Sequence, residues 1–421
     1  MCCAVEDVIK KPKSKEVRLT EAVFTKEMRK THTILLPQML EYHFPILKAA
    51  MIRGGYRCEI LTNRGAVVTE TGKRFVHNDM CFPAVQIIGQ IVNALESGMY
   101  DPKRVAFMLP QTGGACRASN YYHLLKKALK AAGYSYIPVI SLNLSNINSQ
   151  PGFNISLAMI KVAVKAVLLG DLLMHLSLQT EPYEKYFGDT SALLKSWQEK
   201  LCKALSDGKI VSLRELENIS REILKDFSKI EIDKSDKPKV GIVGELYIKY
   251  CSLGNHDSQF FLLNHGCEVR TAGFSVYAFY ILDGMRYDRG NGAAVKKGSA
   301  LLLKYLEKKH NTLCDLFSDF SDFSPLPRYS EYSKKAGKIV SPECITGDGW
   351  LISAEAAVLI ENGCGKILAL CPFGCLVSHI NCKGIVSALK KSYPNAKITA
   401  IDCDADQSSA LFESRLLLAI G

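Results

Sequence analysis

The chain has 421 residues, of which 48% are hydrophobic and 23% are charged, as in a globular protein with buried cores. Its net charge of +11 comes from lysines spread over helix-like segments, with no recognisable nucleic-acid-binding motif, so we expect no nucleic acid partner. No charge-free apolar run reaches about 18 residues and no apolar signal core follows Met1, so we expect a cytoplasmic protein without membrane contact.

The first 150 residues alternate between strand and helix patterns. Buried strands are expected at 33–37, 56–61, 104–109 and 137–142, and helices at 44–53, 83–97 and 119–132. Strands that alternate with helices in this way predict a mostly parallel sheet with helices on both faces. We therefore expect residues 1–150 to form a first α/β lobe.

The middle of the chain has helical apolar spacing almost throughout. Helices are expected at 155–178, 190–207 and 213–227, and the first, which is apolar on nearly all sides, should be central. A short charged linker at 233–238 ends this connecting segment, which we bound at 151–236.

A second α/β lobe is expected over residues 237–421. Its strands begin at Val240–Gly244 and recur at 366–370 and 397–401, with helices at 353–361 and 379–391. Residues 310–348 are rich in loop residues and aromatic residues, which suggests a lid or a packing arm. The fold class is thus α/β, with two doubly wound lobes joined by a helical segment.

Fifteen cysteines raise the question of disulfides or metal binding. In a reducing cytoplasm they do not form a disulfide framework, and most should be small buried hydrophobic residues. The sequence contains no CxxC, which excludes a local zinc-ribbon or ferredoxin motif. A metal site in this chain must therefore be assembled from distant segments.

Three cysteines lie in turns that precede helix-like stretches. Cys81 stands before Phe82-Pro83, where a helix dipole should lower the pKa of its thiol, and Asn78 or Asp79 could cap that helix. Cys116 follows Gly113-Gly114, where the backbone could approach a bulky group, and Cys375 follows Gly374. Such turns gather at the carboxyl ends of strands, so the three thiolates predict an iron–sulfur cluster held at three irons. The alternative is buried structural cysteines, or an anion-binding loop at 113–116.

Two further thiols could extend such a site. Cys371 precedes Cys375 by four residues but has the pattern of a strand end that faces the core, and Cys344 lies before a Gly-Asp-Gly turn. We expect His379 to cap or pack and not to bind metal. Residues 240–245 resemble half of a nucleotide fingerprint, but no GxGxxG or P-loop is present, so we do not expect tight ATP binding.

These motifs resemble a known family. Residues 78–84, 111–121, 240–247 and 372–376 are similar to the C-terminal part of acyl-CoA dehydratase activase-related proteins. That part is itself similar to the 2-hydroxyacyl-CoA dehydratase and benzoyl-CoA reductase subunits and to double-cubane cluster proteins. The resemblance runs from about Phe24 to the C-terminus and implies two α/β lobes with an oxygen-sensitive cluster between them.

The resemblance also implies a site and a partner. Cys81, Cys116 and Cys375 carry over as ligands of a [4Fe–4S] cluster, with Gly113, Gly114 and Gly374 beside it. Cys371 and Cys344 replace the residues expected from the family pattern, which leaves room for a larger double-cubane cluster. Such a cluster needs six thiolates, and Cys382 and Cys403 are the remaining candidates. Electrons would come from a separate iron–sulfur ATPase, the activase.

We therefore expect a low-potential iron–sulfur reductase or dehydratase-like component that acts on a small substrate, with a CoA thioester as the class that the relatives suggest. The alternative is a non-enzymatic electron-transfer or cluster-carrying module, and a weaker third option is a zinc-bearing structural protein. The substrate, the cluster nuclearity, the catalytic acid or base and the formation of a homo-oligomer are left open by the sequence.

Overall fold

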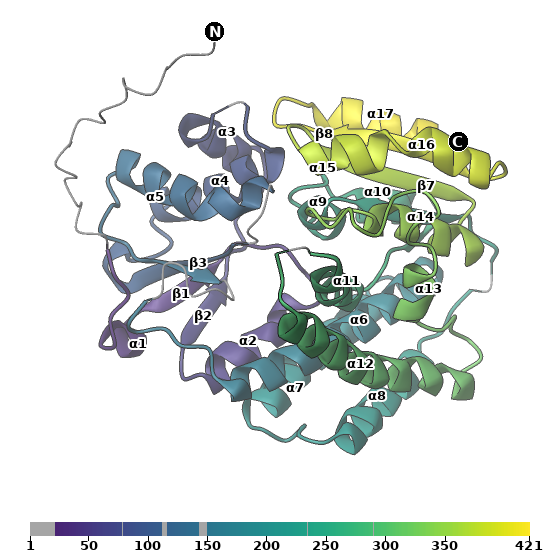
Figure 1. Cartoon of the computed structure of the whole chain (residues 1–421), viewed down its shortest axis with the longest axis horizontal. Helices are drawn as coiled ribbons and strands as arrows, with labels where there is room; N and C mark the ends of the chain where they lie inside the picture. The colour runs from purple at the N-terminus through teal and green to yellow at the C-terminus, as the bar shows by residue number, and fades with distance from the viewer. Residues whose placement is uncertain (1–21, 78, 112–115, 143–149, 234, 289) are drawn as a thin grey trace, which may run out of the picture.

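The computed structural model describes residues 22–77, 79–111, 116–142, 150–233, 235–288 and 290–421. Within these ranges no helix combines the length and the apolar character needed to cross a membrane. The strands are β1 (Thr33–Leu36), β2 (Arg57–Ile60), β3 (Val105–Pro110), β4 (Val139–Leu142), β5 (Lys239–Gly244), β6 (Glu268–Arg270), β7 (Lys366–Pro372) and β8 (Lys397–Cys403). They form two four-stranded sheets, one toward each end of the chain (Figure 1).

Helices surround the two sheets, and the chain between β4 and β5 is also mostly helical. Those of the first half and the middle are α1 (Met28–Thr31), α2 (Phe44–Arg53), α3 (Ala66–Phe75), α4 (Phe82–Glu96), α5 (Tyr121–Ala131), α6 (Leu157–Thr180), α7 (Asp189–Ser206) and α8 (Leu213–Phe227). Those of the second half are α9 (Leu246–Tyr250), α10 (Ser258–Asn264), α11 (Phe274–Tyr287), α12 (Ala293–Leu316), α13 (Tyr329–Ser333), α14 (Leu351–Glu361), α15 (Leu376–Ser378), α16 (Val386–Ser392) and α17 (Ser409–Ile420).

The two sheets have the same topology. Their strand orders are β2-β1-β3-β4 and β6-β5-β7-β8, and every pairing is parallel. In the second sheet the register runs from Lys366 opposite Lys397 to Pro372 opposite Cys403, so β7 and β8 end together. Parallel strands present their carboxyl ends at one edge, where the following turns can meet a ligand.

Both faces of each sheet are covered, as the apolar strand runs require. In the first sheet Ile34 contributes to a core shared with α2 and α6, while the next residue, Leu35, contributes to a core shared with α4 and α5. In the second sheet Ile242 and Val243 alternate in the same way between two cores. The predicted α/β class with two parallel sheets is confirmed.

One hydrophobic core runs through both halves of the molecule. It contains buried residues of β1, β3 and α4 together with residues of β5, β7 and α17, such as Leu35 and Phe412. Helix α6 is central, since all residues of its second half from Leu168 to Thr180 are buried. The apolar surface of this helix was the sequence signal for that position.

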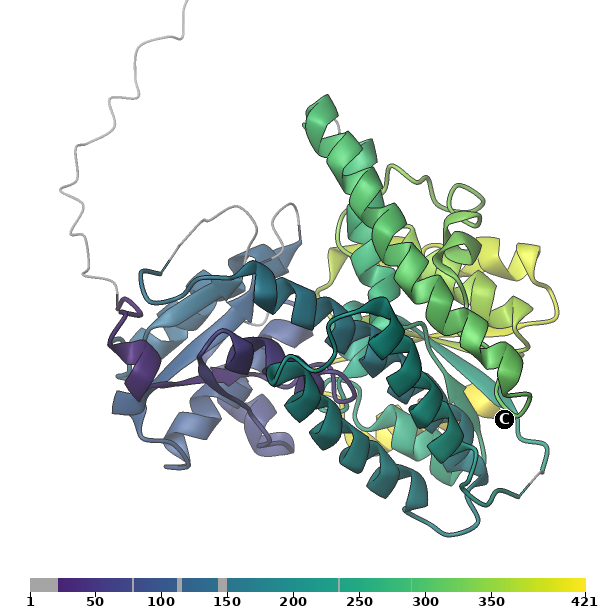
Figure 2. The ribbon, with the colours of Figure 1, turned by 90° about the horizontal axis from the view of Figure 1, so that it is seen from below.

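Three stretches need comment. In residues 310–348, for which the sequence suggested a lid or a packing arm, α12 continues to Leu316 and the aromatic side chains of Phe317, Tyr329 and Tyr332 are buried in the core, which favours the packing arm. The helix expected at 379–391 is broken into a π-helical turn, His379–Lys383, and α16. The helical hairpin of α11 and α12, part of which projects from the body of the molecule (Figure 2), falls in a stretch for which the sequence pattern gave no elements.

Candidate functional site

The turns that carry Cys81 and Cys375 lie against each other, although almost 300 residues of chain separate them. The backbone N–H of Phe82 donates a hydrogen bond of 3.0 Å to the carbonyl oxygen of Phe373. Phe82 follows Cys81 at the start of α4, and Phe373 follows the end of β7. The carboxyl edge of the second sheet is thereby joined to a helix start in the first half of the chain.

Gly374 allows this close approach. Its φ is +73°, and a Cβ at this position would lie 2.9 Å from the Met80 carbonyl oxygen and 3.2 Å from the Cα of Cys81. A side chain here would therefore have to displace the backbone of the Cys81 turn. Packing between the two cysteine turns therefore explains why glycine stands at 374, a position that the sequence had placed in a turn beside the proposed cluster.

Cys116 is linked to the contact between the Cys81 and Cys375 turns through the next residue, Arg117. Cys116 precedes the short 3-10 helix Arg117–Asn120, and the Arg117 guanidinium donates a hydrogen bond to the carbonyl oxygen of Gly374. The side chain of Cys116 is partly exposed. Gly113 and Gly114, which the sequence analysis placed at this site, and the proposed cap Asn78 lie outside the described residues.

Burial is the largest cause of the raised pKa values of the Cys81 and Cys375 thiols. Cys81 is 5% exposed, and burial raises the pKa of its thiol to about 11. Burial likewise raises the pKa of Cys375 to about 12, with the nearby Glu245 carboxylate as a second cause. Cys81 is the N-cap of α4, so Asp79 does not cap this helix. The expectation that the helix dipole lowers the pKa of Cys81 is wrong, because desolvation outweighs the effects that would lower it.

Polar side chains that the sequence analysis did not select surround these thiols. The Tyr121 hydroxyl shares a hydrogen bond of 2.8 Å with Cys81 Sγ, and the Ser378 hydroxyl donates one of 3.3 Å to Cys375 Sγ. Tyr277 of α11 also lies nearby, because the charges of both Cys116 and Glu245 contribute to raising its pKa. These groups belong to different elements, so no local sequence motif could predict that they lie beside the thiols.

Two carboxyl groups stand beside the thiols. Glu245, which ends the Val240–Glu245 motif, caps α9 by accepting a hydrogen bond from the Ile248 N–H. Asp348 of the Gly-Asp-Gly turn is 6% exposed, and burial followed by repulsion from Glu245 raises its pKa well above 3.8. Burial also raises the pKa of Glu245. Both carboxyl groups can therefore hold a proton close to Cys375.

A second group of thiols lies in the second half of the chain. Cys371 and Cys382 are fully buried in one core and share a hydrogen bond, which is the largest cause of the raised pKa of Cys382. Cys403 is close enough for the charge of Cys371 to raise its pKa. Cys344 accepts a hydrogen bond of 3.2 Å from Asn381, the residue before Cys382. His379, as expected, makes a local contact, with the Cys375 carbonyl oxygen.

The donors around these thiols do not form a site for a single metal ion among the described residues. No three His, Cys, Asp or Glu residues within the described ranges are arranged to hold a single metal ion, and no disulfide joins the described cysteines. A cluster spreads its thiolate ligands over several irons, so it requires three thiols around a shared space and not around one ion. Cys81 and Cys375 lie on turns that contact each other, and Cys116 precedes Arg117, which contacts Gly374, so the three residues are of the chemical type that a cluster requires.

The chain was compared with known proteins. It matches no protein-family model, and no curated protein matches it at a significant level.

Proposed function

We propose that this protein is the iron–sulfur component of a low-potential reductase or dehydratase-like system. In this proposal Cys81, Cys116 and Cys375 hold a [4Fe–4S] cluster where the two α/β lobes meet. A separate ATP-hydrolysing activase reduces it, and a small molecule, with CoA thioesters as the leading class, is the substrate. The observation that carries the proposal is the meeting of the three cysteine turns, tied by Phe82 to Phe373 and by Arg117 to Gly374.

The chemistry of the surroundings supports a redox site. When bound, a cluster of this kind supplies single electrons at low potential. The Cys81 thiol is buried and the Cys375 thiol is partly buried, and a thiolate removed from water is stabilised by a positive charge such as a metal centre. The Tyr121 hydroxyl would donate to the Cys81 thiolate, and such hydrogen bonds tune the potential of the group that a thiolate holds.

The protein also offers proton donors at this place. Asp348 and Glu245 have raised pKa values, so they retain protons at pH values where ordinary carboxyl groups are ionised. Lys249 is paired with Glu355 at 2.6 Å, which leaves Asp348 and Glu245 as the carboxyl groups without a cationic partner in the described part of this cluster. A reduction or a dehydration needs proton transfer next to electron transfer, and we assign that task to these two residues.

The cysteine assignment is tested by single substitutions. Each of Cys81→Ala, Cys116→Ala and Cys375→Ala should lose most of its iron and sulfide when the protein is prepared anaerobically. Cys251→Ala is the matched control for a buried thiol and Cys202→Ala for a half-exposed thiol, and both should keep their iron. Circular dichroism and unfolding midpoints establish that each variant is folded. Full iron in all three test variants would refute the assignment.

The second thiol group decides between a single cubane and a larger cluster. Cys371, Cys382, Cys403 and Cys344 would provide the additional ligands of a double cubane. Iron well above four atoms per chain, reduced in part by Cys371→Ser, would support the larger cluster. About four irons, unchanged by that substitution, would assign these thiols to the core.

The alternative proposal is a cluster-carrying electron-transfer module without its own substrate. Asp348 separates the two proposals, because a carrier needs no proton donor. In the enzyme, Asp348→Asn should slow turnover with the reduced partner by about 10²-fold or more while iron content stays unchanged. If partner-dependent electron transfer to an acceptor continues at the same rate and no substrate turns over in the parent protein, the carrier function holds.

A further inference from the structure

Helix α12 keeps one of its faces open to solvent. It forms a hairpin with α11, and part of this hairpin projects from the body of the molecule (Figure 2). The inner face of α12 packs into the core through residues such as Leu303 and Leu313. The outer face carries large apolar side chains, with 62% of Leu301 and 58% of Tyr305 exposed. Exposed apolar side chains that adjoin one another on a single helix indicate an interaction surface.

The exposed residues follow the spacing of a coiled-coil seam. Ala294, Gly298, Leu301 and Tyr305 are separated by four, three and four positions, as the a and d positions of a heptad repeat are. All four are exposed, and a Cβ at Gly298 would have no atom within 4 Å. A seam of this spacing is the face that one partner helix covers.

Lysines without a carboxylate partner flank this seam. Lys297 and Lys304 occupy the g positions beside it, and Lys308 occupies the next d position. All three are exposed, and none of them forms an ion pair within the described part of the chain. Lys309 lies on the ring of Tyr305, with 4.8 Å between its Nζ and the ring centroid. Charges at the positions beside a seam set the choice of partner, and here they call for carboxylates.

This combination of charge and shape selects among the possible occupants. A second α12 would place lysines against lysines, which disfavours pairing of the helix with itself. A helix that lies on a membrane buries a broad apolar face, whereas the seam of α12 is narrow and toward its projecting end consists of Ala294 and Gly298. Small residues at a helix contact allow the axis of a second helix to come close. The face therefore suits a helix and not a lipid surface.

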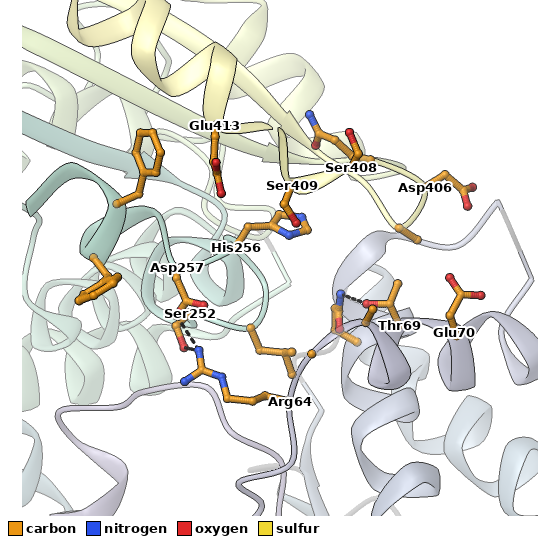
Figure 3. Close-up of a pocket in the computed structure, with 18 of the residues that line it drawn as sticks. Arg64, Thr69, Glu70, Ser252, His256, Asp257, Asp406, Ser408, Ser409 and Glu413 are labelled. Carbon is orange, nitrogen blue, oxygen red and sulfur yellow. Dashed lines mark hydrogen bonds and ion pairs between the residues drawn. The ribbon is translucent and has the colours of Figure 1, made fainter. Parts of the chain in front are cut away.

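A second copy of the chain could offer carboxylates at another place, but most of them are already paired. An open cleft of about 880 Å³ between the two halves of the chain is lined by four carboxylates (Figure 3). Arg64 contacts Asp257 at 2.5 Å, and Lys73 contacts Glu70 at 3.0 Å and Asp406 at 2.5 Å. The surface that complements α12 is thus expected on a different protein.

We propose that the outer face of α12 binds an acidic amphipathic helix of a partner protein. Apolar side chains of that helix would pack on Leu301 and Tyr305 and approach the backbone at Gly298. Its carboxylates would pair with Lys297 and Lys304, so the contact weakens as salt is raised. The proposal uses no residue of the cysteine site and is independent of the proposed function.

Fluorescence anisotropy with a labelled synthetic peptide tests the proposal on the full chain. The peptide has three heptads with leucine at a and d and glutamate at e and g, and we expect saturable, salt-sensitive binding. Lys297→Glu/Lys304→Glu should weaken this binding about tenfold or more and should instead bind the same peptide with lysine at e and g. Lys195→Glu/Lys203→Glu on the exposed face of α7 changes the net charge equally and should bind as the parent does.

The apolar part of the seam has its own pair of variants. Leu301→Ser should weaken peptide binding, whereas Leu418→Ser, at a leucine of α17 that is 76% exposed, should not. Circular dichroism establishes that each variant is folded. No binding of the acidic peptide at millimolar concentration would overturn the proposal. So would an equal loss in the α7 variant, which would assign the binding to net charge alone.

Other occupants of the face have their own outcomes. Vesicles of phosphatidylcholine with phosphatidylserine, or a single-stranded oligonucleotide, overturn the proposal if they bind more tightly than the peptide and lose binding in Lys297→Glu/Lys304→Glu. Self-association of the parent in sedimentation, lost in the same variant, would assign the face to a second copy. These measurements need no iron, so their failure would leave the cluster proposal untouched.

Discussion

Single residues at the junction of the two lobes decide how closely the cysteine turns approach. Gly374 combines a left-handed backbone with contact to the opposite turn, and Tyr121 and Ser378 place hydroxyl groups on two of the thiols. The pKa values of Cys81 and Cys375 follow from burial and not from their positions at helix starts. For the pKa values of these thiols, desolvation is a larger effect than the helix dipole.

Gly374→Ala tests the close approach. The new methyl group meets both an unfavourable φ and the Met80 carbonyl, so we expect a loss of about 2–3 kcal/mol in the free energy of unfolding. Gly363→Ala is the matched control, because Gly363 has φ +91° but no atom within 4 Å of the place where the new methyl group would stand, and it should lose about 1 kcal/mol. Urea unfolding of both variants measures the difference. Equal losses would show that the contact across the junction contributes nothing.

Glu181 gives a prediction of pH dependence. Burial, followed by repulsion from Glu184, raises the pKa of its carboxyl from 4.5 to about 7. The folded state therefore holds a proton that the unfolded state releases, and the native glutamate loses stability as pH rises from 4.5 to 7. Glu181→Gln should match the parent at pH 4.5 and be more stable at pH 8, on the order of 1–2 kcal/mol after allowance for solvent screening. Thermal unfolding across this range measures it, and a gain independent of pH would contradict the assignment.

At the scale of elements, buried polar contacts fix the relative positions of helices more specifically than apolar packing alone does. Lys249 of α9 and Glu355 of α14 form an ion pair at 2.6 Å, with both side chains at most 2% exposed. This pair stands directly behind Asp348, whose pKa responds to both charges. It therefore positions two helices and sets the electrostatic field at the candidate site.

Removing one partner of this pair should be costly. Lys249→Met leaves Glu355 charged, buried and unpaired, and we expect a loss of about 3–5 kcal/mol. The double variant Lys249→Met/Glu355→Leu should lose clearly less than the sum of the two single variants, because no buried charge remains. Lys185→Met, which breaks the exposed pair with Glu231 at 3.1 Å, should lose less than about 1 kcal/mol. Additive losses in the urea-unfolding cycle would contradict the interaction.

At the scale of the whole molecule, one buried carboxylate connects the first lobe, the central helix and the second half. Asp171 of α6 contacts His43 Nε2 at 2.8 Å and accepts hydrogen bonds from the backbone N–H groups of Phe274 and Ser275 at the start of α11. Burial alone would raise the pKa of Asp171, but the contacts with His43 and Ser275 outweigh it and hold the pKa below 3.8. The shared apolar core then makes the two sheets one body.

Asp171→Asn should weaken this connection between the lobes. We expect a loss of about 3 kcal/mol at pH 7, since charge-assisted hydrogen bonds to buried donors are lost. Because the folded pKa lies below the unfolded one, the contribution of the carboxylate is complete above about pH 4 and disappears only as pH falls below it. The loss should thus shrink as pH falls from about 4 to about 3. Asp226→Asn, at a partly exposed pair with Lys229, is the control for urea unfolding. A loss of the same size at pH 3 as at pH 5 would contradict the explanation.

The sequence by itself determined the secondary structure of most of the chain and its α/β class. Local periodicity carries that information: α2 and α8 lie where the apolar spacing predicted them, and α8 begins with the capping box of Ser212 and Glu215. The three cysteine turns were visible because glycine and proline mark turns at strand ends and helix starts. Weak signals were missed, such as the three-residue β6 and the amphipathic α3.

Only the tertiary structure decided what surrounds those cysteines. Glu245, Asp348 and the pair Arg117 and Tyr121 come from three separate segments, and their contacts depend on long-range packing that no local pattern encodes. The sequence left open whether the aromatic residues of 310–348 form a lid or a packing arm, and long-range packing buries Phe317, Tyr329 and Tyr332. Local spacing specifies which elements form, whereas contacts between distant segments specify which side chains share a site.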